Sequence, residues 1–181
     1  MAWKLKKPVA LVGMMGSGKT AVGSALASRL HVPFVDSDTE IVRAANMAIP
    51  EIFARDGEAF FRAREAEVLQ RLLDGPLGII STGGGAFLSP ANRAAIMGKG
   101  LSVWLRGDLP LLWERVRHRS TRPLLQTEDP KGTLARLIKE RDPIYALADL
   151  AVDAHRDYSI DDMVDRVTET LLSRDDVLEA R

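Results

Sequence analysis

The residues with the clearest chemistry lie in one short stretch, Gly13–Thr20, which reads G-M-M-G-S-G-K-T. It matches the phosphate-binding loop pattern G-x-x-x-x-G-K-[ST] in full. In such a loop the backbone N–H groups point at phosphate oxygens, and the following helix adds partial positive charge. We expect Lys19 to reach the β- and γ-phosphates and the Thr20 hydroxyl to bind Mg²⁺. The alternative is a glycine-rich turn that binds nothing.

The flanking residues support the phosphate-binding interpretation. Val9–Val12 is a short apolar run typical of a buried strand, and Lys19–Leu30 has apolar residues at helical spacing. Strand, glycine turn and helix therefore follow in the order that the motif needs. The nucleotide contacts predicted beside Lys19 and Thr20 are Gly13, Gly16, Ser17, Gly18 and Ala21.

Two carboxylates, Asp36 and Asp38, follow the next predicted strand, Pro33–Val35. Ligands of open parallel sheets bind at the carboxyl ends of the strands. One carboxylate could hold Mg²⁺ through water while the other accepts a proton from an attacking hydroxyl. The alternative is structural, because Asp38 precedes a predicted helix and aspartate is a favoured N-cap.

Two further segments carry weaker signals. Three glycines, Gly83, Gly84 and Gly85, follow the predicted strand Gly78–Ser81 and could let the backbone approach a ligand closely. Arg62 shares a helical face with Glu65, and Glu58 precedes it by one turn. Without other information, that charged face is more simply read as a solvated set of ion pairs.

Arginines gather around the segment 115–122, at Arg115, Arg117, Arg119 and Arg122, and Arg141 follows near a helix break. Arginine suits bidentate contact with phosphate and can stabilise the charge of phosphoryl transfer. A solvated basic helix end is the alternative, and we expect only one or two of the four to be functional.

Composition limits the class of protein. The 181 residues suit one domain, with 46% hydrophobic and 28% charged residues. Lys+Arg and Asp+Glu both number 25, so the zero net charge argues against bulk binding to nucleic acid or to an anionic membrane. There is no cysteine for a disulfide or a thiolate metal site. No apolar run approaches a membrane span and no signal peptide is recognisable, so we expect a cytoplasmic enzyme.

Predicted strands and helices alternate, which implies a parallel α/β sheet covered on both faces. The other strands are expected at Ser102–Leu105 and Leu150–Val152, and the last helix at Ser159–Ser173. We expect one domain with its core at 8–172, an insertion at about 38–74 that binds substrate, a lid at about 115–132, and a frayed tail at 174–181.

Taken together, these segments resemble the shikimate kinase family over roughly residues 8–165. The motifs that carry the likeness are Gly13–Thr20, Asp36-Ser37-Asp38, the Phe53-to-Glu65 segment, Gly83–Gly85, Arg122-Pro123-Leu124-Leu125, and Arg141 with Pro143 and Tyr145. The resemblance implies a P-loop fold of the nucleoside-monophosphate-kinase type with a five-stranded parallel sheet. It also implies ATP- and Mg²⁺-dependent phosphorylation of the 3-hydroxyl of shikimate, a step towards chorismate and the aromatic amino acids.

The resemblance also implies roles for single residues. Asp38 would contact the shikimate hydroxyls and is the candidate base, while Asp36 would orient the Mg²⁺ waters. The shikimate carboxylate would be held by Arg62, Arg141 and the Gly84 N–H, with Glu65 supporting the arginines. Arg122 would contact ATP phosphates from the lid. Arg115 and Arg117 are candidates for the adenine side, and Arg156 lies in the segment that would contact adenine.

Two other functions stay open at this point. A gluconate kinase of the same fold would share the phosphate loop, although Asp36, Asp38, Arg62 and Arg141 favour a carboxylated cyclic polyol. A non-catalytic nucleotide-binding relative would be expected to lack Lys19 or Asp38, and both are present. The family resemblance further suggests a monomer.

Overall fold

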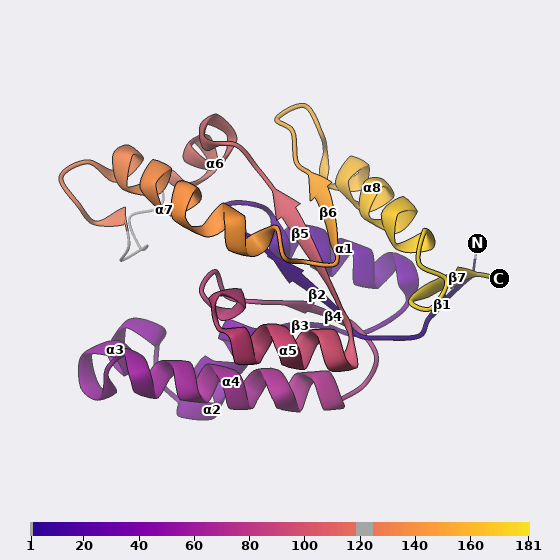
Figure 1. The fold of residues 1–181 in the computed structure, drawn as a ribbon, viewed down its shortest axis with the longest axis horizontal. Helices are drawn as coiled ribbons and strands as arrows, with labels where there is room; N and C mark the ends of the chain where they lie inside the picture. Colours follow the sequence, from indigo (N-terminus) through magenta and orange to yellow (C-terminus); the bar gives the residue numbers. More distant parts are fainter. Residues whose placement is uncertain (1, 119–124) are drawn as a thin grey trace.

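A parallel sheet with the strand order β3-β4-β2-β5-β6 forms the centre of the molecule (Figure 1). The computed structural model describes residues 2–118 and 125–181. In spatial order the strands are β3 (Phe34–Asp36), β4 (Ile79–Ser81), β2 (Val9–Val12), β5 (Leu101–Arg106) and β6 (Leu150–Asp153), and each neighbouring pair is parallel. The predicted five-stranded parallel sheet is therefore confirmed.

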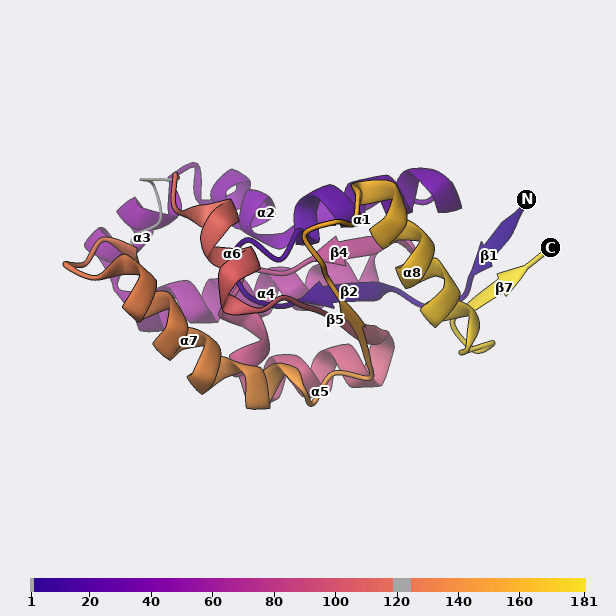
Figure 2. The ribbon, with the colours of Figure 1, turned by 90° about the horizontal axis from the view of Figure 1, so that it is seen from above.

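Side chains alternate along β2 between the two faces of the sheet. Val9 and Leu11 pack with α1 (Lys19–Leu30) and α8 (Ile160–Leu172). Ala10 and Val12 point the other way, and the cluster around them takes its buried residues from α4 (Glu58–Asp74), α5 (Pro90–Lys99), α6 (Leu109–Val116) and α7 (Pro130–Tyr145). Seen from above, the strands lie between these two groups of helices (Figure 2). Because both faces are buried, the strand is continuously apolar, as the sequence suggested.

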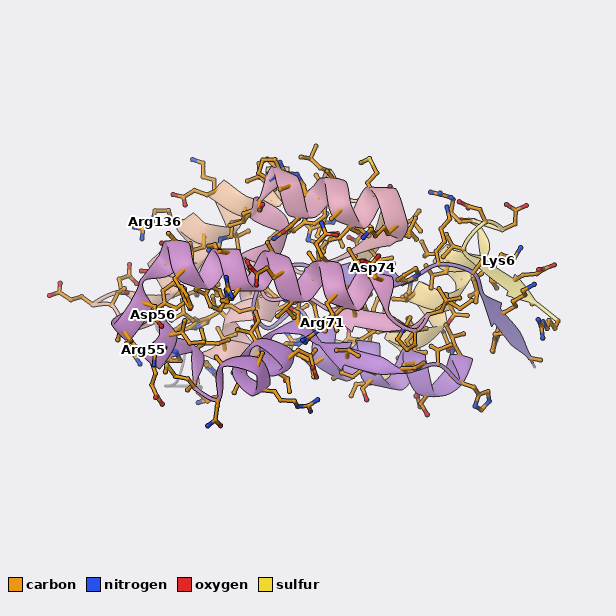
Figure 3. All side chains as sticks on the ribbon, turned by 90° about the horizontal axis from the view of Figure 1, so that it is seen from below. Lys6, Arg55, Asp56, Arg71, Asp74 and Arg136 are labelled. Carbon is orange, nitrogen blue, oxygen red and sulfur yellow. The ribbon has the colours of Figure 1, made fainter. Side chains whose placement is uncertain are left out.

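Three helices, α2 (Ser37–Ala45), α3 (Ile49–Asp56) and α4, connect β3 to β4 where one crossover helix would suffice. Ile41, Ile52, Phe61 and Val68 give this insertion a small hydrophobic cluster of its own. Arg71 of α4 also reaches Glu40 of α2, with 3.6 Å between Nη2 and Oε2, and Figure 3 shows Arg71 between the two helices. The insertion thus holds α2 and α4, which carry Asp38 and Arg62, in a fixed relation.

Predicted element boundaries agree with the structure to within a residue or two in most places. α1 spans the predicted range, and α8 ends at Leu172, one residue before the predicted end. Residues 119–124 of the expected lid lie outside the described residues, so the lid remains a prediction. No helix in the described part of the chain is long and apolar enough to cross a membrane.

The expectation of a frayed tail at 174–181 is wrong. Leu178–Ala180 forms β7, which pairs antiparallel with β1 (Trp3–Leu5), a strand that the sequence interpretation also missed. The physical reason is that Val177 and Leu178 are buried against the cluster that contains α1 and α8. Lys6, labelled beside these strands in Figure 3, adds an ion pair to Glu179 at 3.2 Å.

This packing predicts a clear effect on stability. Leu178→Ala should lower the free energy of unfolding by about 2 to 5 kcal/mol, because it leaves a cavity at a buried site. Denaturation with guanidinium chloride measures the change. Glu179→Ala is the matched control on the neighbouring residue, and its exposed ion pair should contribute little. Equal effects of the two substitutions would mean that the tail does not pack as described.

Candidate active site

A cavity of about 760 Å³ opens at the carboxyl ends of β2, β3 and β4. The phosphate loop and the start of α1 line it, together with Asp36, Asp38, Gly83 and Gly84. Arg115 and the beginning of α8 contribute the rest of the wall. Residues from distant parts of the sequence therefore meet at the edge of the sheet where ligands of this fold class bind.

The loop after β2 has a backbone shape that requires glycine. Gly13, Gly16 and Gly18 have φ values of 146°, 81° and 94°, a region that other residues rarely adopt. A Cβ on Gly13 would also lie 2.8 Å from the Leu105 carbonyl oxygen. Within the loop, the buried Oγ of Ser17 has no hydrogen-bond partner among the described residues. A buried hydroxyl without a protein partner, in a glycine-rich loop that matches the phosphate-binding pattern, suits a bound phosphate.

Lys19 begins α1 and turns back over the loop. Its Nζ donates hydrogen bonds to the carbonyl oxygens of Gly13 at 2.7 Å and Met14 at 3.0 Å. The ammonium group is therefore held over the loop, in reach of phosphates that would bind along it.

Asp36 and Thr20 come together across the first crossover. The Thr20 hydroxyl donates to Asp36 Oδ2 at 3.1 Å, and Asp36 Oδ1 accepts from the Thr39 N–H at 3.1 Å. Asp36, rather than Asp38, is thus the N-cap of α2, so the structural alternative considered for Asp38 is wrong. While Asp36 caps the helix through Oδ1, its Oδ2 stays beside the Thr20 hydroxyl, which the motif predicts to bind Mg²⁺.

Asp38 lies in the first turn of α2 and faces the cavity. Its Oδ1 is buried without a hydrogen-bond partner among the described residues. Burial raises the pKa of this carboxyl, and the charge of Asp36 raises it further, while Lys19 and Arg62 act in the opposite direction. A carboxylate that is desolvated, unpaired and near two cations is suited to accept a proton from a bound hydroxyl.

The three glycines after β4 make room for these side chains. A Cβ on Gly83 would lie 2.6 Å from Asp38 Oδ1, and one on Gly85 would lie 2.5 Å from Arg62 Nη1. At Gly84 the same atom would be 3.6 Å from Arg141 Nη1. The Gly83 N–H is used internally, since it donates to Ser37 Oγ at 3.2 Å. Gly83 therefore acts by its lack of a side chain, not as a donor to a ligand.

Arg62 is held in the site by a buried partner. Its Nη1 donates to Glu65 Oε1 at 2.9 Å and Oε2 at 3.2 Å, whereas its distance to Glu58 is 3.6 Å. Glu65 is only 1% exposed, and burial raises the pKa of its carboxyl while Arg62 lowers it. The sequence interpretation expected solvent-exposed ion pairs on this face of the helix, but Glu65 is buried. Glu65 holds the Arg62 guanidinium, which points towards Gly85.

The structure separates the candidate arginines. Arg115 Nη1 donates to the Gly16 carbonyl oxygen at 2.9 Å, and Arg115 lines the cavity, where burial lowers the pKa of its guanidinium. Arg117 donates instead to His118 and is exposed, as is Arg156; neither lines the cavity formed by the described residues. Arg122 lies outside the described residues.

Some wall residues were missed by the sequence interpretation. Tyr158, Ser159, Ile160 and Met163 line the cavity at the start of α8. The capping box of Ser159 and Asp162 marked this helix start, but nothing local to it indicates a ligand. Tyr145, whose hydroxyl donates to the Gly84 carbonyl oxygen, was likewise quoted only as part of a motif.

The site has few groups for a metal. Within residues 2–118 and 125–181 there is no cluster of three His, Cys, Asp or Glu side chains that could hold an ion alone. Magnesium in kinases needs only one or two protein groups, because substrate phosphates and water supply the other ligands. Thr20 with Asp36 fits that pattern.

Comparison with known proteins gives a consistent result. The family model described as "Shikimate kinase" matches residues 15–172. A shikimate kinase from Ruegeria pomeroyi is 61% identical over 175 residues, which cover 97% of this chain and 90% of the relative. The structure of a shikimate kinase from Acinetobacter baumannii in complex with shikimate aligns with a TM-score of 0.88 and 37% identity, over 93% of this chain and 94% of the other.

The alternative family is more distant. A gluconokinase structure from Sinorhizobium meliloti aligns with a TM-score of 0.62 and 19% identity, over 94% of both chains. A likeness at that identity shows the shared fold alone.

Proposed function

The chain belongs to the shikimate kinase family, and we propose that it transfers the γ-phosphoryl group of ATP to the 3-hydroxyl of shikimate. The observation that carries the proposal is that one cavity joins the phosphate loop to Asp38, Gly83 and Gly84. Arg141 lies beside Gly84, and Arg62 lies beside the next glycine, Gly85. Shikimate is a small carboxylate with three hydroxyls, and this set offers cations for the former and a carboxylate for the latter.

On the nucleotide side, the loop N–H groups, Lys19 and Arg115 would hold the phosphates of ATP. Thr20 and Asp36 would hold Mg²⁺, which would supply positive charge to offset that of the phosphates. Lys19 keeps its ammonium group close to the developing charge of the transferred group. The roles of Arg117 and Arg156 near adenine, and of Arg122 on a lid, remain predictions.

On the substrate side, Arg62, Arg141 and the Gly84 N–H would bind the carboxylate, and Glu65 would fix the orientation of Arg62. That anchoring would place the 3-hydroxyl near Asp38, which would accept its proton as phosphoryl transfer proceeds. The raised pKa of Asp38 improves its match to an alcohol proton at neutral pH. Positioning and electrostatics then supply most of the catalysis, as is general for phosphoryl transfer.

The decisive test is coupled release of ADP from Mg-ATP with shikimate, with gluconate and with no acceptor. We expect release only with shikimate, at about 1–100 s⁻¹ as for other kinases. Release with gluconate alone would overturn the carboxylate-clamp interpretation and leave the phosphate loop intact. Binding of ATP without acceptor-dependent release would make the chain a non-catalytic nucleotide-binding relative.

The proposal includes a setting for the reaction. We expect a cytoplasmic monomer that uses ATP and Mg²⁺ and acts without nucleic-acid or membrane partners. Light scattering of the purified chain tests the monomer, and a mass twice that of the chain would contradict it.

A further inference from the structure

Tyr145 is a fully buried tyrosine at the end of α7, with 0% of its surface exposed. Its ring packs against Trp104 of β5, with 6.1 Å between the ring centroids. Aromatic packing of this kind explains a ring at this position but not a hydroxyl. The hydroxyl therefore needs a separate explanation, because burying a polar group lowers stability unless the group makes a hydrogen bond.

The hydroxyl has one hydrogen-bond partner and one neighbouring cation, and both belong to the proposed carboxylate site. It donates a hydrogen bond to the Gly84 carbonyl oxygen. The Arg141 guanidinium, one helical turn earlier on α7, is close enough to this hydroxyl for its charge to lower the hydroxyl pKa. Gly84 and Arg141 are themselves neighbours, since a Cβ on Gly84 would be 3.6 Å from Arg141 Nη1.

We propose that Tyr145 is a positioning residue that fixes Gly84 and Arg141 together in the geometry that binds the substrate carboxylate. The inference rests on the proposed function, because it concerns how that site selects its acceptor. One phenol holds a backbone segment from the end of β4 and a side chain from α7, two elements far apart in the sequence. It does not touch the substrate in this role and acts through these two neighbours.

Burial supports the assignment. It raises the pKa of the Tyr145 hydroxyl, so the proton needed for the bond to Gly84 stays in place at neutral pH. The Arg141 charge lowers that pKa but remains the smaller effect. Arg141 in turn lies beside this hydroxyl before substrate arrives, which reduces the side-chain ordering that binding would otherwise require.

Tyr145→Phe tests the proposal, because it keeps the ring against Trp104 and removes only the hydroxyl. We expect the KM for shikimate to rise about tenfold, with kcat and the KM for ATP changed by less than about twofold. Thr168→Val is the matched control. It deletes another buried hydroxyl, which donates to the Val164 carbonyl oxygen at 2.7 Å within α8, and should lower stability without changing the KM for shikimate.

A second acceptor separates the proposed role from a general loss of packing. On the same cyclohexene triol without its carboxylate, wild type and Tyr145→Phe should have equal kcat/KM. An equal fall with both acceptors, or no change with shikimate, would overturn the positioning role while leaving the proposed function intact. Absence of shikimate-dependent ADP release in the wild type would instead overturn the proposed function.

A measurement on the unmutated Tyr145 keeps the test valid should the Phe variant not fold. The chain has two tyrosines, so incorporation of 3-fluorotyrosine gives two fluorine resonances, which Tyr158→Phe assigns. Shikimate should shift the Tyr145 resonance and the triol without a carboxylate should not. A Tyr145 resonance that responds to neither compound would contradict the inference.

Discussion

Lys19→Ala is expected to lower kcat by at least about 10³-fold, because the charge that develops on the transferred phosphoryl group loses its nearest cation. The Gly13 and Met14 carbonyl oxygens hold the Lys19 ammonium over the loop, so the alanine variant loses a positive charge that the wild type keeps in place. Coupled ADP release under saturating Mg-ATP and shikimate measures the loss.

Lys99→Ala is the matched control for this substitution. Lys99 lies on α5 and pairs with Asp74 at 2.6 Å, away from the cavity. Its removal should leave kcat unchanged, and circular dichroism should show the same fold for both variants. A Lys19→Ala enzyme with near-normal turnover would remove the lysine from the mechanism.

Asp38→Asn is expected to lower kcat by at least about 10²-fold, since an amide cannot accept the proton of the 3-hydroxyl. The wild-type kcat should rise with pH through the raised pKa of Asp38, and the variant should lack that limb. Steady-state kinetics across pH measure both effects. If only the KM for shikimate changed, Asp38 would be a binding group and its role as the base would be wrong.

The same substitution should stabilise the protein near neutral pH. Burial places the pKa of folded Asp38 above its ordinary value of 3.8, so the wild type loses stability as pH rises through the folded pKa. The variant carries no charge to bury, and its Tm should exceed that of the wild type at pH 7 and equal it below pH 3.8. Asp74→Asn, at a carboxylate 63% exposed, should show no such gain.

The sequence was most informative where chemistry and backbone shape depend on the same residues. Gly13, Gly16 and Gly18 are required by left-handed backbone, and Lys19 follows them at a fixed distance along the chain, so the loop could be predicted from local rules. Asp36 and Asp38 were placed correctly at a strand end because parallel strands bring their carboxyl ends to one edge.

What could not be predicted depends on contacts between distant segments. Nothing near Ser37 indicates that its hydroxyl accepts from the Gly83 N–H. The polar tail gave no sign of β7, because its stability comes from two buried residues, Val177 and Leu178, and from a strand at the other end of the chain. The sequence also could not show that Asp36 caps α2 while Asp38 Oδ1 stays without a hydrogen-bond partner among the described residues. That difference depends on where the helix begins.

The central place of β2 in the sheet has a consequence for how the site is assembled as the chain folds. Val9 pairs with Ile79 on one side and with Leu101 on the other, and the Gly13 turn packs on the Leu105 carbonyl at the end of that second neighbour. The local sequence favours α1 as a helix, whereas the loop that precedes it also packs against the end of β5 and so depends on a distant segment. Such non-local pairings slow folding, and they make affinity for ATP a property of the assembled sheet rather than of the motif.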